Sequence, residues 1–158
     1  MKKLFIPLLL MVLVSGSVYA QDTKNSLQAN ILYGSKIETV GFGFTFNLTG
    51  KKHEFSPSLN VYLPKNDIKV REINFDYHRL YGIGNKIKVF PIVGFALSVW
   101  DTNIESTDTN ETKFGVNLGI GGRYDINEKF HAGFQFKYGA MTESASQSVP
   151  MLTIAYKL

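Results

Sequence analysis

The sequence contains no cysteine, so disulfide bonds contribute nothing to the stability of this protein. It also lacks a large excess of charge of either sign, since 17 Lys and Arg stand against 13 Asp and Glu, a formal net charge of +4. Two of the positive charges, Lys2 and Lys3, belong to a segment that we expect to be removed. The remaining chain is therefore close to neutral, which argues against a nucleic-acid partner.

A long hydrophobic run is missing as well. The longest apolar stretch, from Leu4 to Val14, is shorter than the ~20 residues that a membrane-spanning helix requires. It follows two lysines and precedes a small-residue segment that ends at Ala20, an order typical of a secretory signal peptide. We therefore expect residues 1–20 to be a cleaved signal peptide and residues 21–158 to form one exported domain.

No segment of the mature chain shows a sustained helical period. Apolar residues instead alternate with small or polar residues, the pattern of β-strands with two different faces. The alternating segments are 26–34, 40–48, 54–63, 70–81, 87–100, 113–126, 130–140 and 149–158. The sequence therefore predicts an all-β protein.

The two faces of these segments differ in a way that distinguishes a membrane barrel from a soluble one. In segment 40–48 one face carries four large residues and a leucine, and the other carries Gly41, Gly43, Thr45 and Asn47. Glycine weakens a strand and marks close backbone approach, so a glycine-rich polar face suits the crowded inside of a small barrel. Segments of this length cross a bilayer when tilted, and a sheet in lipid must close on itself.

We therefore predict an eight-stranded antiparallel up-and-down transmembrane β-barrel. Its lipid-facing residues are predicted to include Val40, Phe42, Phe44, Phe46, Phe134 and Phe136. The soluble alternative is a periplasmic lipocalin-like carrier, in which the same strands turn their apolar face inward around an apolar ligand.

Charged and polar residues on the opposite face are predicted to lie in the lumen. They are Glu72, Asp76, His78, Arg123, Gln135 and Lys137. Because a narrow interior penalises unpaired charges, we expect an ion-pair plug in which Arg123 and Lys137 meet Glu72 and Asp76. The functional alternative is a narrow polar conduction path lined by the same residues.

Two local features interrupt this regular pattern. Residues 101–112 form the longest predicted connection, and Pro91 falls inside segment 87–100. Proline cannot donate a ladder hydrogen bond, so Pro91 predicts a bulge or a shifted register.

The leader, the eight alternating segments and the strand pair VFPIVGFALSVW and KFGVNLGIGGRYDINEKF resemble the outer-membrane β-barrel domain proteins of Gram-negative bacteria. These are the small OmpA/OmpX-like, porin-family barrels. The resemblance implies that the alternating end of the chain, with Ile154, Tyr156 and Leu158, is the signal read by the barrel assembly machinery. The family commonly ends in Phe, and Leu158 takes that place here.

The resemblance also implies an outer-membrane location, contact with outer-membrane lipid and lipopolysaccharide, and a monomer without a cofactor. Its role would be structural, surface-interactive or that of a minor pore. A lipid-modifying barrel enzyme is the remaining alternative, but His53, His78 and His131 lack the His-x-Ser-Asn pattern of lipid A deacylases. We therefore expect no catalytic residues and no metal site.

Overall fold

The computed structural model describes residues 25–66, 68–104 and 107–158, so the predicted signal peptide lies outside the described residues. Every regular element in this part of the chain is a β-strand. The strands are β1 (Ser26–Gly34), β2 (Thr39–Thr49), β3 (His53–Tyr62), β4 (Ile68–Arg79), β5 (Tyr81–Ile83), β6 (Ile87–Ile104), β7 (Thr107–Asp125), β8 (Phe130–Met141) and β9 (Gln147–Lys157). Among the described residues, no helix is long and apolar enough to span a membrane.

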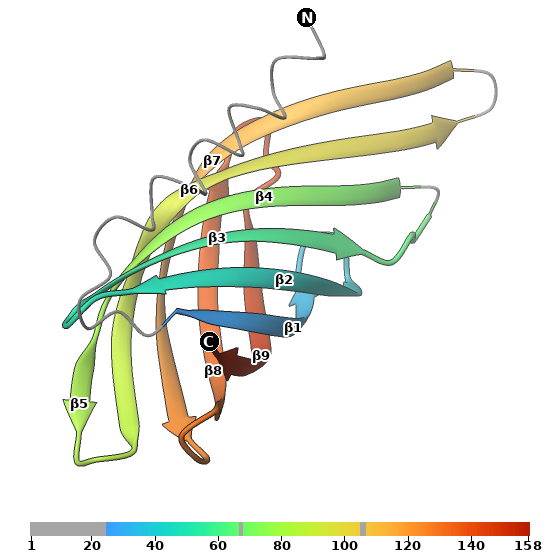
Figure 1. Ribbon diagram of the computed structural model, residues 1–158. Helices are drawn as coiled ribbons and strands as arrows, with labels where there is room; N and C mark the ends of the chain where they lie inside the picture. Colours follow the sequence, from blue (N-terminus) through green and yellow to red (C-terminus); the bar gives the residue numbers. More distant parts are fainter. Residues whose placement is uncertain (1–24, 67, 105–106) are drawn as a thin grey trace, which may run out of the picture.

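The strands form one antiparallel sheet that closes on itself (Figure 1). Strands adjacent in sequence are adjacent in the sheet, and β1 pairs with β9 to complete the ring. The short β5 continues β4, because both pair with β6 in one register, His78 opposite Ile92 and Tyr81 opposite Val89. With β4 and β5 counted as one strand, the predicted eight-stranded up-and-down barrel is confirmed.

Prolines interrupt the ladders of this barrel without changing their register. Pro91 lies between the two β4/β5–β6 pairs just named, where the ladder has a gap, and it remains paired with Ile120 of β7. The predicted bulge or register shift at Pro91 is therefore wrong. The ladder lacks two register positions there, but the Pro91 side chain points outward and the register is the same on both sides of the gap. Pro57 leaves the same kind of gap in the β2–β3 ladder while pairing with Phe75 on the other side.

The barrel has two distinct ends. We call the one that carries connections 50–52, 84–86 and 126–129 the turn end. The other, the hairpin end, carries connections 35–38, 63–67 and 142–146 and the paired extensions of β6 and β7. Those two strands run past their neighbours (Figure 1) and are paired as far as Ile104 opposite Thr107. Most of the predicted loop 101–112 is therefore strand, because residues 101–104 pair with residues 107–110.

Side chains alternate between the two sides of the wall along every long strand. Large apolar residues are exposed on the outside, whereas the buried residues fill the lumen, and most of these are polar. Two buried apolar clusters are also inside. The larger one lies toward the hairpin end, and the smaller one consists of Leu80, Phe90 and Ile92.

Candidate functional site

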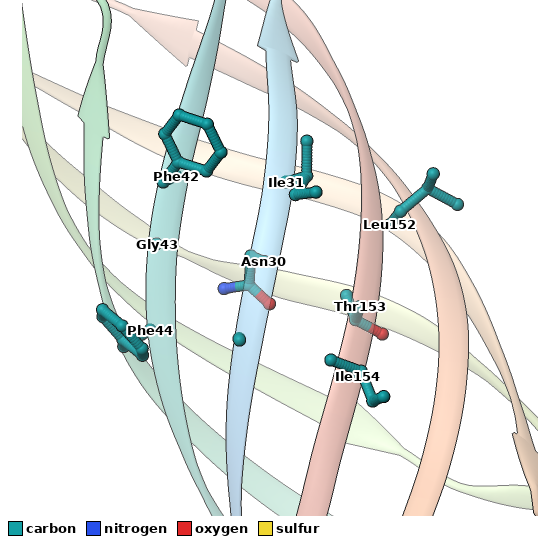
Figure 2. Close-up of a pocket in the computed structure, with 9 residues that line it drawn as sticks. Asn30, Ile31, Phe42, Gly43, Phe44, Leu152, Thr153 and Ile154 are labelled. Carbon is teal, nitrogen blue, oxygen red and sulfur yellow. The ribbon is translucent and has the colours of Figure 1, made fainter.

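The six residues predicted to face lipid all lie on the outer surface. Phe44 and Phe42 are 65% and 52% exposed, and Phe46 is partly covered. Between β9, β1 and β2 the small side chain of Ala29 leaves a shallow apolar hollow of about 330 Å³, bordered by the exposed side chains in Figure 2. The remaining predicted members, Val40, Phe134 and Phe136, are also exposed.

The predicted assembly signal lies at the seam where the barrel closes. Ile154, Tyr156 and Leu158 point outward, with Leu158 71% exposed. The backbone N–H of Leu158 donates to the carbonyl oxygen of Asn25, 2.8 Å away, which extends the β1–β9 pairing to the end of the chain.

The most densely connected group in the lumen is centred on Glu54, which lies near the turn end. Its carboxylate accepts hydrogen bonds from Arg123 Nη1 at 2.7 Å and from Thr49 Oγ1 at 2.6 Å, and it contacts His78 Nδ1 at 3.0 Å. Phe90 packs against this group. The His78 ring stacks on the Phe90 ring with centroids 4.7 Å apart, and the Arg123 guanidinium lies 5.8 Å from the centre of the Phe90 ring. The result is a buried, charge-compensated unit that joins five strands, β2, β3, β4, β6 and β7.

A second group is centred on Asp76, further from the turn end. Lys137 Nζ donates to Asp76 Oδ2 at 2.8 Å, and Asn117 Nδ2 donates to Asp76 Oδ1 at 2.8 Å and to Asn74 Oδ1 at 2.7 Å. Asn74 Nδ2 in turn donates to Glu72 Oε1 at 2.8 Å. The backbone of Gly94 faces this group, and a Cβ there would collide with the Asp76 carboxylate.

The structure thus places the six predicted lumen residues inside the barrel but pairs them differently from the prediction. Lys137 does meet Asp76, whereas the carboxylate that Arg123 contacts is Glu54 rather than Glu72 or Asp76. Glu72 is held by the amides of Asn60 and Asn74. Gln135 is buried but makes no side-chain hydrogen bond with another described residue.

An uncharged ladder completes the polar interior along β1 and β2. Gln28 Nε2 donates to Asn30 Oδ1 at 2.7 Å, and Asn30 Nδ2 donates to Thr45 Oγ1 at 2.8 Å. Asn47 connects this ladder to the Glu54 group through Ser56. The Ser56 Oγ donates to Asn47 Oδ1 at 2.8 Å and contacts His78 Nδ1 at 3.3 Å.

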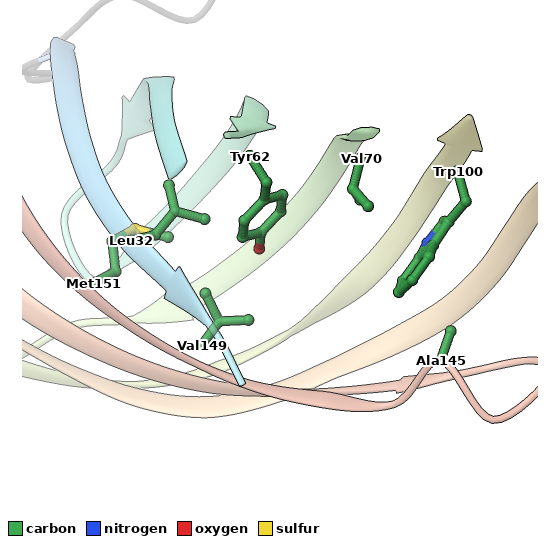
Figure 3. Packing of buried hydrophobic residues seen from close by; sticks show 7 residues of the cluster. All are labelled: Leu32, Tyr62, Val70, Trp100, Ala145, Val149 and Met151. Atoms are coloured by element: carbon green, nitrogen blue, oxygen red, sulfur yellow. The ribbon is translucent and has the colours of Figure 1, made fainter. Parts of the chain in front are cut away.

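Toward the hairpin end the lumen is filled by apolar side chains instead. We call this cluster the apolar cap (Figure 3). Its buried members are Leu32, Tyr62, Val70, Trp100, Ala145, Val149 and Met151. Lys113 lies over the Trp100 ring, with its Nζ 4.9 Å from the ring centre, and Gln147 Nε2 donates to the Tyr62 hydroxyl at 3.4 Å.

Sequence reasoning missed both Glu54 and the apolar cap. Glu54 could have been found, because it belongs to the predicted segment 54–63 and alternates there with the apolar Phe55, which places the two side chains on opposite faces. The cap could not, because Leu32, Val70 and Val149 are inward-facing apolar residues in strands whose outer face is also apolar. Only the tertiary arrangement brings them into contact.

Ser56, His78 and Glu54 are in contact, but their geometry is not that of a hydrolytic triad. In a triad the nucleophile and the acid bind opposite ring nitrogens of the histidine. Here Ser56 Oγ, at 3.3 Å, and Glu54 Oε1, at 3.0 Å, both contact Nδ1 of His78. All three side chains are buried in the lumen, away from the lipid-facing surface. Among the described residues no group of His, Cys, Asp or Glu is arranged to hold a metal ion.

A closed ring of eight antiparallel strands with a polar, side-chain-filled lumen and an apolar exterior defines a small transmembrane β-barrel. The chain belongs to the outer membrane protein beta-barrel domain family, whose sequence model matches residues 6–156. Membership places the protein in the outer membrane and confirms the resemblance inferred from the sequence. No curated protein matches the sequence significantly.

Solved structures similar to this one are also outer-membrane barrels. The N-terminal β-barrel domain of OprF from Pseudomonas aeruginosa has a TM-score of 0.72 at 15% identity, covering 87% of this chain and 100% of that one. Neisserial surface protein A has a TM-score of 0.71 at 12% identity, covering 87% and 98%. The outer membrane enzyme PagL is more distant, with a TM-score of 0.50 at 9% identity, covering 84% and 98%. At these identities the similarity shows the fold alone.

Proposed function

We propose that this protein is a non-conducting structural barrel of the outer membrane whose hairpin end is its contact surface. The observation that carries the proposal is that the lumen is filled at two levels by different chemistry. The Glu54 group lies near the turn end of the lumen and the Asp76 group lies further in. The apolar cap fills the lumen at the hairpin end. A continuous water path would have to pass both, which argues against the minor-pore alternative.

Conductance in a planar bilayer tests this proposal. The native barrel is expected to give no resolved current steps. A variant with Glu54→Ser, Arg123→Ser and Trp100→Ala removes side-chain volume from both levels while conserving net charge, and it is expected to conduct. Steps from the native barrel that match those of the variant would overturn the proposal.

The protein is proposed to lack enzymatic activity, because both contacts of His78 fall on one ring nitrogen and the group is buried. Incubation with purified lipid A and with phospholipid, followed by mass spectrometry, is expected to leave both unchanged. Loss of an acyl chain that depends on His78 would refute this proposal.

The protein is proposed to be a monomer. Its outward row that contains Phe42 and Phe44 is proposed to contact lipid acyl chains and the lipid portion of lipopolysaccharide.

The contact surface for other molecules is proposed to be the β6–β7 hairpin, because it projects beyond the rest of the wall (Figure 1). Deleting residues 102–109 from this hairpin should abolish binding of an extracellular partner to the protein. The heat-dependent gel mobility shift of a folded barrel should persist.

Export by a Gram-negative cell and insertion by the barrel assembly machinery complete the proposal. Intact-mass measurement of the membrane-extracted protein is expected to give a chain that begins at Gln21. Replacing Tyr156 and Leu158 by serine is expected to leave the exported chain uninserted, whereas serine at the lumen-facing position Thr153 is expected to have little effect.

A further inference from the structure

A small polar cavity lies inside the barrel at the turn end, next to the Glu54 group. Its volume is about 80 Å³, and its walls come from six strands. The lining residues are Ser26, Thr49, Lys88, Arg123, Asp125, His131 and Lys157. Because a water molecule takes up about 30 Å³, the cavity has room for two or three waters or for one small oxyanion.

Two buried side chains that line this cavity have unused hydrogen-bonding groups. His131 is only 3% exposed, and neither of its ring nitrogens has a partner among the described residues. Nε of Arg123, a residue 8% exposed, is also without a partner there. Buried hydrogen-bonding groups without a partner are destabilising, so an acceptor in the cavity would be favourable.

The charges around the cavity favour an anion. Arg123 is paired with Glu54, and Lys157 is paired with Asp125 at 2.7 Å. Lys88 lies directly opposite Arg123 in the β6–β7 register and has no ion-pair partner among the described residues. The charge of Lys88 is therefore not compensated by a carboxylate, and Lys88 faces a second cation, Arg123. An anion between these two side chains would reduce their mutual repulsion.

We propose that this cavity binds a small oxyanion of the inorganic phosphate class. Lys88 Nζ, Arg123 Nε and a ring N–H of His131 donate to its oxygens. Ser26 adds a fourth donor, because its Oγ accepts from Asn47 Nδ2 at 3.1 Å and its own hydrogen has no acceptor among the described residues. Asp125 also lines the cavity, and its carboxylate is paired with Lys157. All the lining side chains belong to the lumen side of the wall, so the anion enters from the aqueous phase at the turn end.

Isothermal titration of sodium phosphate into detergent-refolded protein, at constant ionic strength, tests the proposal. Saturable binding of one phosphate per chain is expected. Lys88→Gln should weaken binding at least tenfold, whereas the matched control Lys51→Gln, an exposed lysine in the 50–52 turn at the same end, should change the Kd less than twofold. No saturable binding by the native barrel, or equal loss in both variants, would overturn the proposal.

Nuclear magnetic resonance of native protein labelled with ¹⁵N histidine provides a measurement that needs no variant. Phosphate is expected to shift the ring nitrogens of His131 and to leave those of His53 unchanged, since His53 lies on the outer surface beside Tyr77. Ring signals of His131 that stay unchanged at saturating phosphate would refute the assignment.

Discussion

In the polar part of the lumen Glu54, Arg123 and Asp76 are held by charge-assisted hydrogen bonds, whereas at the hairpin end Leu32, Tyr62 and Trp100 pack without any ion pair. Both regions are buried inside the same wall of strands. They differ in how strongly each residue depends on a single partner. Removing one member of a buried ion pair leaves an uncompensated charge, whereas removing one apolar side chain leaves a cavity that its neighbours can partly fill.

This difference also separates two roles that the lumen has to perform. The polar groups are directional, so each one defines which strands lie opposite each other across the barrel. Glu54 on β3 and Arg123 on β7 are far apart in the ring of strands but are joined at 2.7 Å. The cap is non-directional, because apolar packing does not depend on single donor–acceptor pairs. The following variants test this division.

Glu54→Gln is expected to have the largest effect, because it leaves Arg123 buried without its counter-charge. The free energy of unfolding should fall by about 3–5 kcal/mol. Urea unfolding in lipid vesicles, followed by gel mobility, measures it. The control is Glu38→Gln, which breaks the exposed 3.0 Å pair with Lys65 and should cost less than about 1 kcal/mol. Equal effects of the two changes would show that the buried pair does not stabilise the barrel.

Leu32→Ala should have an intermediate effect, a loss of about 2 kcal/mol, at the low end of the usual range because the cap borders the rim and can relax. Trp100 is the only tryptophan of the chain and is in the cap, so its fluorescence reports this region alone. The control is Leu27→Ala on the same strand, which is 51% exposed and points outward. A fluorescence change in the control but not in Leu32→Ala would contradict the assignment of the cap.

Replacing a buried ion pair as a whole should have the smallest effect. The double change Asp76→Leu and Lys137→Met is expected to alter the free energy of unfolding by less than about 1 kcal/mol, because it removes both charges together. Asn117 keeps its hydrogen bond to Asn74. Lys137→Met alone should cost about 3 kcal/mol, since it leaves Asp76 charged and buried. A double variant less stable than the single one would show that the pair stabilises the barrel beyond charge balance.

The fold could be predicted closely from the sequence, because the strongest signal in the sequence, the alternation of residue types along each strand, is local. The alternation of Phe42 and Phe44 with Gly41 and Gly43 encodes both a strand and the difference between its two sides. The local signal of a proline was misleading, because a strand inside a closed sheet pairs on both sides and can lose pairing on one side without bending. Pro91 predicted a bulge, but it interrupts only the β4/β5–β6 ladder while its pairing with β7 keeps the strand straight.

The candidate sites were only partly predictable. Alternation identifies residues with inward-facing side chains, but it contains no information about which inward residue lies across the lumen. That depends on the tilt of the strands and on closure between β1 and β9. Arg123 was consequently assigned to the wrong carboxylates, and the turn-end cavity with its unpartnered His131 was not anticipated.

The sequence by itself determined the strands, the ring of eight and the character of each face, because a period of two residues is a property of the backbone that any single strand reveals. Only the tertiary structure decided that Glu54 compensates Arg123, that apolar side chains pack together toward the hairpin end, and that a cavity lined by three cationic side chains remains at the turn end. These contacts join residues on strands that are not neighbours, and closure of the barrel brings them together.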